Sequence, residues 1–142
     1  MQIKIKLLKE GFTPSFTREG DACLDCKAAI EYAYVTVMPH SRVLIPLGFA
    51  MEVPVGYEAQ IRPRSGYTKK GIDLGWGTVD SNYRGEFNCQ VINNTDNAFE
   101  IKKGDRVCQL AIRKTEDVSF LEVEELDNTV RGAKGFGSSG TK

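Results

Sequence analysis

The fold is decided by one stretch of the sequence, Val43-Leu-Ile-Pro-Leu47-Gly-Phe49-Ala-Met-Glu-Val53-Pro-Val-Gly-Tyr57-Glu-Ala-Gln-Ile-Arg62. It contains three apolar or alternating runs, and each run is only as long as a β-strand. The breaks between the runs contain glycine or proline, which favour tight turns. The stretch therefore predicts consecutive short strands rather than a helix.

The same pattern extends through most of the chain, and no segment carries the i, i+3, i+4, i+7 spacing of an amphipathic helix. One segment departs from it, because Ser65–Lys70 could form a short helical turn that Ser65 caps and Gly71 ends. We therefore predict an all-β fold, a jelly roll or distorted β-barrel of short strands with at most one short helical turn. The further strand-length runs are Ile3–Leu8, Val35–Met38, Phe87–Ile92, Val107–Ile112 and Val118–Val123.

The length of 142 residues fits one domain with a real hydrophobic core. We predict that residues 1–127 form this β domain. Residues 128–142 are rich in glycine, serine and threonine and have little apolar area to bury, so we expect a flexible tail.

The charge balance argues against broad polyanion surfaces, because 19 Lys and Arg residues balance 19 Asp and Glu residues. We therefore expect no nucleic-acid partner, and any bound polyanion should be small and held locally. The sequence also lacks the apolar run of a signal peptide and the roughly 18 apolar residues of a membrane span. We expect a cytoplasmic protein without a membrane partner.

The cysteines allow two interpretations. Cys23 and Cys26 have the spacing of half a zinc site or of a redox pair, but no second close pair follows, and His40 is the only histidine. Buried, reduced thiols are the better interpretation. His40 lies in a turn-like composition, and we expect it at the surface.

Arg64-Ser-Gly66 follows an apolar run with a guanidinium, a hydroxyl and a glycine that permits close backbone approach. These groups are the parts of a phosphate cradle. The alternative is an ordinary solvated arginine at the end of a strand.

Gly77-Thr-Val-Asp80-Ser-Asn-Tyr83-Arg-Gly-Glu86 places a carboxylate and an aromatic ring close together in a predicted strand–turn–strand that begins near Gly71. A carboxylate there can orient or deprotonate a water, and a flat ring can test the shape of a sugar. The alternative is a simple hairpin in which Asp80 and Asn82 satisfy turn amides.

The C-terminal segment Arg131–Gly140 spaces Gly132 and Gly137 as in a Walker A loop, but Ser138 stands where the lysine belongs. What remains is a strip that could close over a nucleotide, with Phe136 stacked on a base and Arg131 and the serines at phosphates. The alternative is an irregular C-terminus.

Together these segments resemble the trimeric, all-β dUTP nucleotidohydrolases, the dUTPases, whose five short motifs occur in this order. The matching segments are Asp21–Cys26, Arg64–Gly66, Gly77–Glu86, Asp105–Leu110 and Arg131–Gly140.

The resemblance implies Mg²⁺-dependent hydrolysis of dUTP to dUMP and pyrophosphate. This reaction limits uracil in DNA and supplies dUMP for dTMP synthesis. The catalytic residue would be Asp80, which holds the attacking water for in-line displacement at the α-phosphorus and meets the sugar 3′-hydroxyl. Asp25 would contact the Mg²⁺ cofactor through metal-bound water. Tyr83 would pack against C2′ and exclude a ribose hydroxyl.

The resemblance also implies that main-chain groups of the Gly71–Val79 hairpin read the uracil edge, and that a homotrimer shares its sites between chains. The remaining substrate-binding residues would be Arg64, Ser65, Gly66, Gly77, Thr78, Val79, Asn88, Gln109, Arg131, Phe136, Gly137, Ser138 and Ser139.

Some positions depart from the family pattern. Cys23 stands where the first motif usually has glycine, and Cys26 where it has an apolar residue, so the backbone path there is less certain. The short hairpin Asp73–Gly77 lacks an asparagine that some members direct at uracil. Neither departure removes a charged group from the implied site.

Two other functions remain as alternatives. The dCTP deaminases share the fold, but they need a glutamate about five residues beyond Gly85, where this chain has Gln90. An amide cannot serve as that acid and base. A nonenzymatic β-sandwich binding module would leave Asp80, Gln109 and the tail unexplained together.

Overall fold

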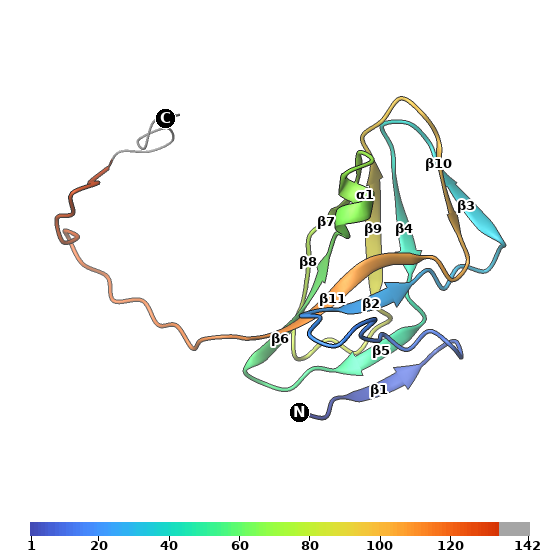
Figure 1. Cartoon of the computed structure of the whole chain (residues 1–142). Helices are drawn as coiled ribbons and strands as arrows, with labels where there is room; N and C mark the ends of the chain where they lie inside the picture. The colour runs from blue at the N-terminus through green and yellow to red at the C-terminus, as the bar shows by residue number, and fades with distance from the viewer. Residues whose placement is uncertain (134–142) are drawn as a thin grey trace.

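Short strands account for most of the regular structure in this computed structural model, which describes residues 1–133 (Figure 1). The elements in chain order are β1 (Lys4–Leu7), β2 (Leu24–Lys27), β3 (Tyr34–Val37), β4 (Arg42–Pro46), β5 (Phe49–Glu52), β6 (Tyr57–Arg62), α1 (Ser65–Thr68), β7 (Ile72–Gly75), β8 (Gly77–Val79), β9 (Asn88–Asn93), β10 (Phe99–Lys102) and β11 (Arg106–Lys114). The predicted all-β fold is confirmed.

The strands pair antiparallel in four sheets. The two larger sheets have the strand orders β2-β11-β6-β8 and β4-β9-β7, and the two smaller ones pair β1 with β5 and β10 with β3. Alternation is clear in β9, where Cys89, Val91 and Asn93 are buried and the residues between them are not. This period of two gives each sheet one face toward the core.

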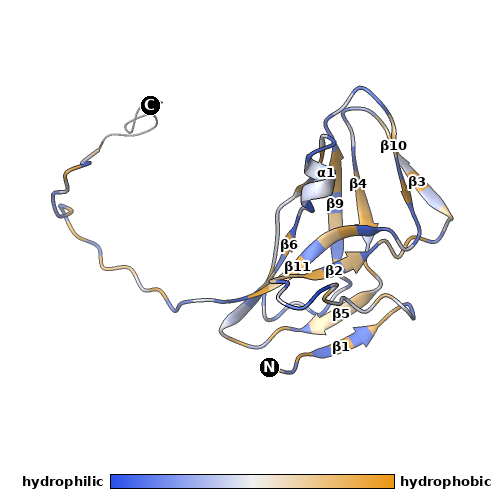
Figure 2. Ribbon diagram, in the orientation of Figure 1, coloured by the Kyte–Doolittle hydropathy of each residue, from blue (hydrophilic) through white to orange (hydrophobic). Residues whose placement is uncertain are grey.

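The core lies between these sheets and is almost entirely apolar, as the orange strands of Figure 2 show. Phe49 and Phe87 are its largest buried side chains, and their ring centroids lie 5.3 Å apart. Burying one such side chain contributes about 1.5–3 kcal/mol. Asn93 is the buried polar residue in the described chain, and its Nδ2 donates to the main-chain oxygens of Val37 and Asn97.

Seven of the eight predicted strand runs overlap observed strands. The run Val118–Val123 is not a strand, because a strand needs a hydrogen-bonded partner and this segment has none in the described part of one chain. Four short strands, β2, β7, β8 and β10, lay outside the predicted runs.

The predicted helical turn is present as α1, but its predicted cap is wrong. The N-cap residue is Arg64 in extended backbone, without a side-chain cap hydrogen bond, and Ser65 is the first helical residue. Ser65 therefore faces solvent rather than its own helix. Gly71 ends the turn as predicted, with a φ of 77° that suits glycine.

The predicted hairpin over Gly71–Val79 is also wrong. Strand β7 pairs with β9, and β8 pairs with β6, so β7 and β8 belong to different sheets. Trp76 is the single residue between them. This segment therefore carries the chain from the three-stranded sheet to the four-stranded one.

After β11 the chain leaves the domain as an extended arm, residues 116–133, which lies away from the sheets (Figure 1). It carries large exposed apolar side chains at Val118, Phe120, Leu121, Leu126 and Val130. A single chain therefore leaves this apolar area in water. In residues 1–133, no helix is long and apolar enough to span a membrane.

Candidate active site

Asp25 on β2 is the centre of a charged cluster. Its Oδ2 accepts a hydrogen bond of 2.7 Å from Thr17 Oγ1 and lies 3.4 Å from Arg106 Nη1. Arg64 Nε lies 3.2 Å from Oδ1. The Asp25 side chain is only 10% exposed, so both guanidinium groups meet a nearly enclosed carboxylate.

These contacts keep Asp25 ionised. Burial by itself raises the pKa of this carboxyl, but the Thr17 hydrogen bond, the charges of Arg64 and Arg106 and a hydrogen bond from Gln109 outweigh it. The pKa of Asp25 is therefore lowered from its ordinary value of 3.8.

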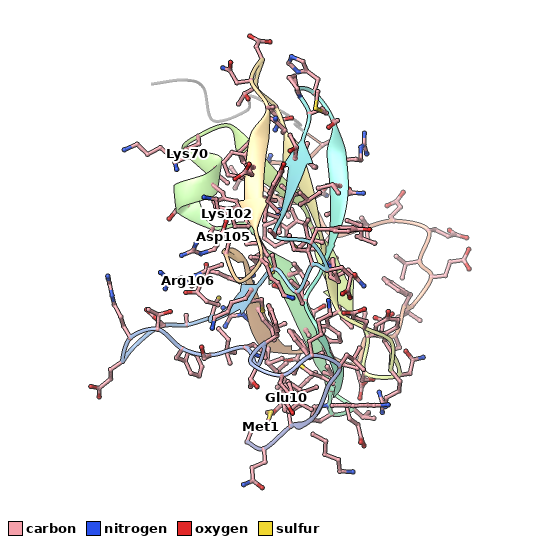
Figure 3. The ribbon with its side chains drawn as sticks, turned by 90° about the vertical axis from the view of Figure 1, so that its right-hand side faces the viewer. Met1, Glu10, Lys70, Lys102, Asp105 and Arg106 are labelled. Carbon is pink, nitrogen blue, oxygen red and sulfur yellow. The ribbon has the colours of Figure 1, made fainter. Side chains whose placement is uncertain are left out.

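Local backbone structure brings these groups together. Ser15 and Asp25 exchange main-chain hydrogen bonds of 3.2 and 2.8 Å, which place the segment before Thr17 beside β2. Arg64 precedes α1, and its Nη1 donates to the Arg106 oxygen at 2.9 Å. Figure 3 shows Lys102, Asp105 and Arg106 close together at the turn before β11, with Met1 and Glu10 at the lower end of the domain in this view.

Two members of this cluster were not singled out from the sequence. Arg106 lies inside the fourth matching segment, Asp105–Leu110. Its positive charge in that segment is the feature that could have identified it. Thr17 lies in a polar loop, and its hydrogen bond to Asp25 spans eight residues of sequence. No spacing pattern in the sequence indicates that contact.

Gln109 belongs to the same cluster through strand register. It stands opposite Asp25 on one side and opposite Arg62 on the other, so these three residues form one row across β2, β11 and β6. Directly opposite residues share a face of the sheet. Arg62 continues the row toward Trp76, whose ring centroid lies 5.7 Å from the Arg62 guanidinium carbon.

A second group of predicted residues lines a cavity of about 270 Å³ at the end of β8. The predicted residues Gly77, Thr78, Val79, Asp80, Tyr83 and Asn88 are all in its wall, together with Ile61, Glu86 and Phe87. The cavity wall therefore combines the polar side chains of Asp80, Tyr83 and Asn88 with the apolar side chains of Ile61 and Phe87. This composition is typical of a small-molecule site.

Tyr83 forms one wall of this cavity. Its main-chain N–H donates to the Asp80 oxygen at 3.1 Å, which closes a turn, and its hydroxyl donates to the Glu86 oxygen at 3.0 Å. Asn88 Nδ2 donates to the same Glu86 oxygen at 2.9 Å. In the described chain, the Asp80 carboxylate has no hydrogen bond or ion pair and is free to bind water or ligand.

The charged cluster and the cavity are built from different parts of the four-stranded sheet. Ile61 lines the cavity and stands opposite Gly77 and Leu110. The next residue, Arg62, points to the other face with Gln109 and Asp25, because successive side chains of a strand alternate. One chain therefore holds two separate groups of predicted site residues.

Of the C-terminal site residues, Arg131 belongs to the arm of residues 116–133. This arm lies away from the sheets that carry both groups (Figure 1). Phe136, Gly137, Ser138 and Ser139 lie outside the described residues.

The cysteines are free. Cys26, Cys89 and Cys108 are buried, and Cys23 is half-buried. Cys108 forms hydrogen bonds with the thiols of Cys26 and Cys89, which together with burial raise its pKa well above its usual range. The Cys108 thiol therefore stays protonated. Free, mostly buried cysteines agree with the preferred interpretation. His40 is exposed, as predicted, and its Nε2 lies 2.8 Å from Asp96 Oδ1.

Comparison with known proteins identifies the family of this chain. The dUTPase family model matches residues 9–140. The deoxyuridine 5′-triphosphate nucleotidohydrolase of Rhizobium rhizogenes is 47% identical over 131 residues, covering 89% of this chain and 84% of that protein. The protein of the same name from Fusobacterium nucleatum is 40% identical over 144 residues, covering 98% of each chain. The structure of Staphylococcus bacteriophage 80alpha dUTPase with dUPNHPP has a TM-score of 0.87 at 27% identity and covers 98% of each chain.

Proposed function

The chain belongs to the dUTPase family, and we propose that it hydrolyses dUTP to dUMP and pyrophosphate at sites shared between chains. As a dUTP diphosphatase it is an enzyme rather than a binding module, and it is a nucleotide hydrolase rather than a deaminase. The observation that carries the proposal is the cavity at the end of β8, whose wall contains Asp80, Tyr83 and Asn88.

The cavity at β8 suits the nucleoside. Main-chain groups of Gly77, Thr78 and Val79 are available to the uracil edge, since β8 is the last strand of its sheet and one of its sides is unpaired. Tyr83 presents its ring to the sugar, where a ribose 2′-hydroxyl would clash and remain without a hydrogen bond. The short segment Asp73–Gly77 contains no asparagine, so recognition of uracil would rest on main-chain groups and not on a side-chain amide.

The Asp25 cluster suits the phosphates. Arg64 and Arg106 are fixed cations, and Gln109 adds an amide donor in the same row. Ser65 and Gly66 begin α1, where main-chain N–H groups have no partner within the helical turn. Charged and main-chain donors of this kind bind phosphate oxygens well.

The residues fit a Mg²⁺ ion that the triphosphate largely holds. Asp25 Oδ1 is buried and receives no hydrogen bond within residues 1–133, although Arg64 lies near it. No group of three or more His, Cys, Asp or Glu side chains in that part of the chain could hold a metal by itself. Mg²⁺ commonly uses one carboxylate together with water and substrate phosphates. When bound, it offsets the negative charge of the triphosphate.

Asp80 would orient and deprotonate the attacking water molecule. Its carboxylate is exposed at the rim of the cavity and has no partner in the described chain, so it can accept a proton from a water molecule. That water would attack the α-phosphorus in line with the departing pyrophosphate. Asp80 also lies beside Tyr83, where the sugar 3′-hydroxyl would be in reach.

Two features support a homotrimer with shared sites. The Asp25 cluster and the Asp80 cavity share no residue in the described chain, as expected if the cluster of one chain meets the cavity of another. The arm of residues 116–133 also exposes Phe120 and Leu121 by 95% and 87%, which a neighbouring chain would cover. The residues Arg131, Phe136, Gly137, Ser138 and Ser139 would then close over the nucleotide from a third chain.

Product analysis tests the proposal. Purified protein with Mg²⁺ should release dUMP and pyrophosphate from dUTP, with much slower turnover of UTP and dTTP. Chelation of the metal should nearly stop the reaction while the assembly stays intact by size-exclusion chromatography, because the cations near Asp25 alone do not offset a triphosphate. Conversion of dCTP to dUTP, or full activity in chelator, would contradict the proposal.

A further inference from the structure

Gly85 lies against the ring of Tyr83. A Cβ atom built on Gly85 would be 2.3 Å from Tyr83 Oη, 2.5 Å from Cζ and 3.0 Å from Cε2. These three atoms are its nearest neighbours, and all belong to one ring. Ordinary contacts between carbon atoms are about 3.5–4.0 Å, so any side chain here collides with Tyr83.

The backbone does not itself require glycine at this position. Gly85 is absent from the glycines with positive φ, unlike Gly48, Gly56 or Gly71. Alanine would therefore fit the backbone conformation without strain. The reason for glycine at position 85 is the space that the Tyr83 ring occupies.

Tyr83 is held from two further sides, so the ring cannot move freely away from Gly85. Its hydroxyl donates to the Glu86 oxygen at 3.0 Å, and its ring centroid lies 6.1 Å from that of Phe87. Glu86 is fixed in turn, because its Oε1 accepts from the Gly48 N–H at 3.0 Å. Gly85 is the third side of this enclosure.

We propose that Gly85 is a positioning residue for sugar selection. By having no side chain, it lets the Tyr83 ring lie flat at the wall of the cavity, at the depth that rejects a 2′-hydroxyl. The inference rests on the proposed role of Tyr83 and adds the residue that sets its position. A Cβ at position 85 forces the ring to shift by about 1 Å or to give up its bond to Glu86.

A double-mutant cycle tests this inference. The variants are Gly85→Ala, Tyr83→Ala and the two together, and the readout is the ratio of kcat/KM for dUTP to that for UTP. Gly85→Ala should lower this ratio by about tenfold or more. In the Tyr83→Ala background it should change nothing further, because no ring remains to be displaced. Asn82→Ala, an exposed change in the same loop, is the control and should keep the ratio.

An unchanged ratio in Gly85→Ala, or a loss that persists in the Tyr83→Ala background, would overturn the inference. The midpoint of thermal unfolding, measured on the same variants, separates failure of the Gly85 inference from failure of the proposed function. If Tyr83→Ala alone keeps the sugar preference, the role of Tyr83 is wrong. In that case the unfolding midpoints test whether Gly85 positions the Tyr83 ring. Non-additive midpoint changes for Gly85→Ala and Tyr83→Ala support this positioning, and additive changes overturn it.

Discussion

Single residues of the charged cluster already pair two cations with one anion. Arg64 Nε lies 3.2 Å from Asp25 Oδ1 and Arg106 Nη1 lies 3.4 Å from Oδ2, so each cation meets its own oxygen of the carboxylate. In the proposed complex, a triphosphate would bring more negative charge to the same guanidinium groups. Asp25 therefore keeps both arginines in place, and it retains one oxygen without a hydrogen bond in the described chain.

The lowered pKa of Asp25 predicts a pH-dependent contribution to stability. Because the folded protein holds this carboxyl below its ordinary pKa of 3.8, the contribution is complete above that value and is lost as the pH falls through the folded pKa. The difference in unfolding free energy between the native chain and Asp25→Asn should shrink below pH 3.8. Urea titrations at several pH values measure it, and a difference that grows at acid pH would contradict the ion-pair account.

Asp80 should matter for turnover and not for binding. Asp80→Asn keeps the size and polarity of the side chain but cannot take a proton, so kcat should fall by about 10²-fold or more. Binding of a non-hydrolysable dUTP analogue, measured by calorimetry, should change little. A variant with near-normal kcat would remove Asp80 from the proton transfer.

At the scale of elements, strand register and one loop build the two groups. The row Asp25, Gln109 and Arg62 follows from the pairing of β2, β11 and β6. The cavity needs β8 and the loop that returns to β9, and Phe87 supports this loop from the core. Packing beneath the loop therefore also determines the shape of the cavity.

Phe87→Ala tests this support. Phe87 is 1% exposed and contacts Phe49 below and Tyr83 above, with ring centroids at 5.3 and 6.1 Å. Its removal should cost about 3–5 kcal/mol of unfolding free energy in urea titrations. The matched change Phe16→Ala, at a side chain 58% exposed, should cost well under that amount. Equal losses for the two variants would contradict the assigned packing.

For the whole molecule, the Asp25 cluster and the Asp80 cavity would belong to different sites of an assembly. Each chain would give its cavity to one site and its charged cluster to another, and the arm of residues 116–133 lies away from the sheets that carry both (Figure 1). The arm carries large exposed apolar side chains, including Phe120 and Leu121. Assembly would therefore complete both the sites and the burial of the arm.

Complementation between inactive variants tests this arrangement. One variant carries Asp80→Asn with an intact tail, and the other ends at Asn128 with Asp80 intact. Each should be nearly inactive alone, because every site lacks one component. Coexpression should restore activity, since some mixed sites combine a sound Asp80 with a sound tail from another chain. If each tail served its own chain's Asp80, the mixture would stay as inactive as its parents.

The sequence was enough for the fold class and for most of the strands. Alternating runs such as Tyr57–Arg62 carry their own period, and turn residues mark their ends, so local physics determines them. It also supplied Asp25, Arg64, Gln109 and Asp80, because these chemically specific side chains occur in recognisable segments, but it did not single out Thr17 or Arg106. Strands β2, β7 and β10 also alternate apolar and polar residues, but they and β8 are only three or four residues long, and they form because neighbours pair with them.

Tertiary structure alone decided where these residues lie. The segment Gly71–Val79 has the composition of a hairpin, yet its two strands join different sheets, because pairing partners are chosen by packing and not by local propensity. Thr17 reaches Asp25 only through the main-chain bridge at Ser15. The Asp25 row and the cavity at Asp80 both depend on the pairing of β6 with β8 and β11, which no single segment of sequence encodes.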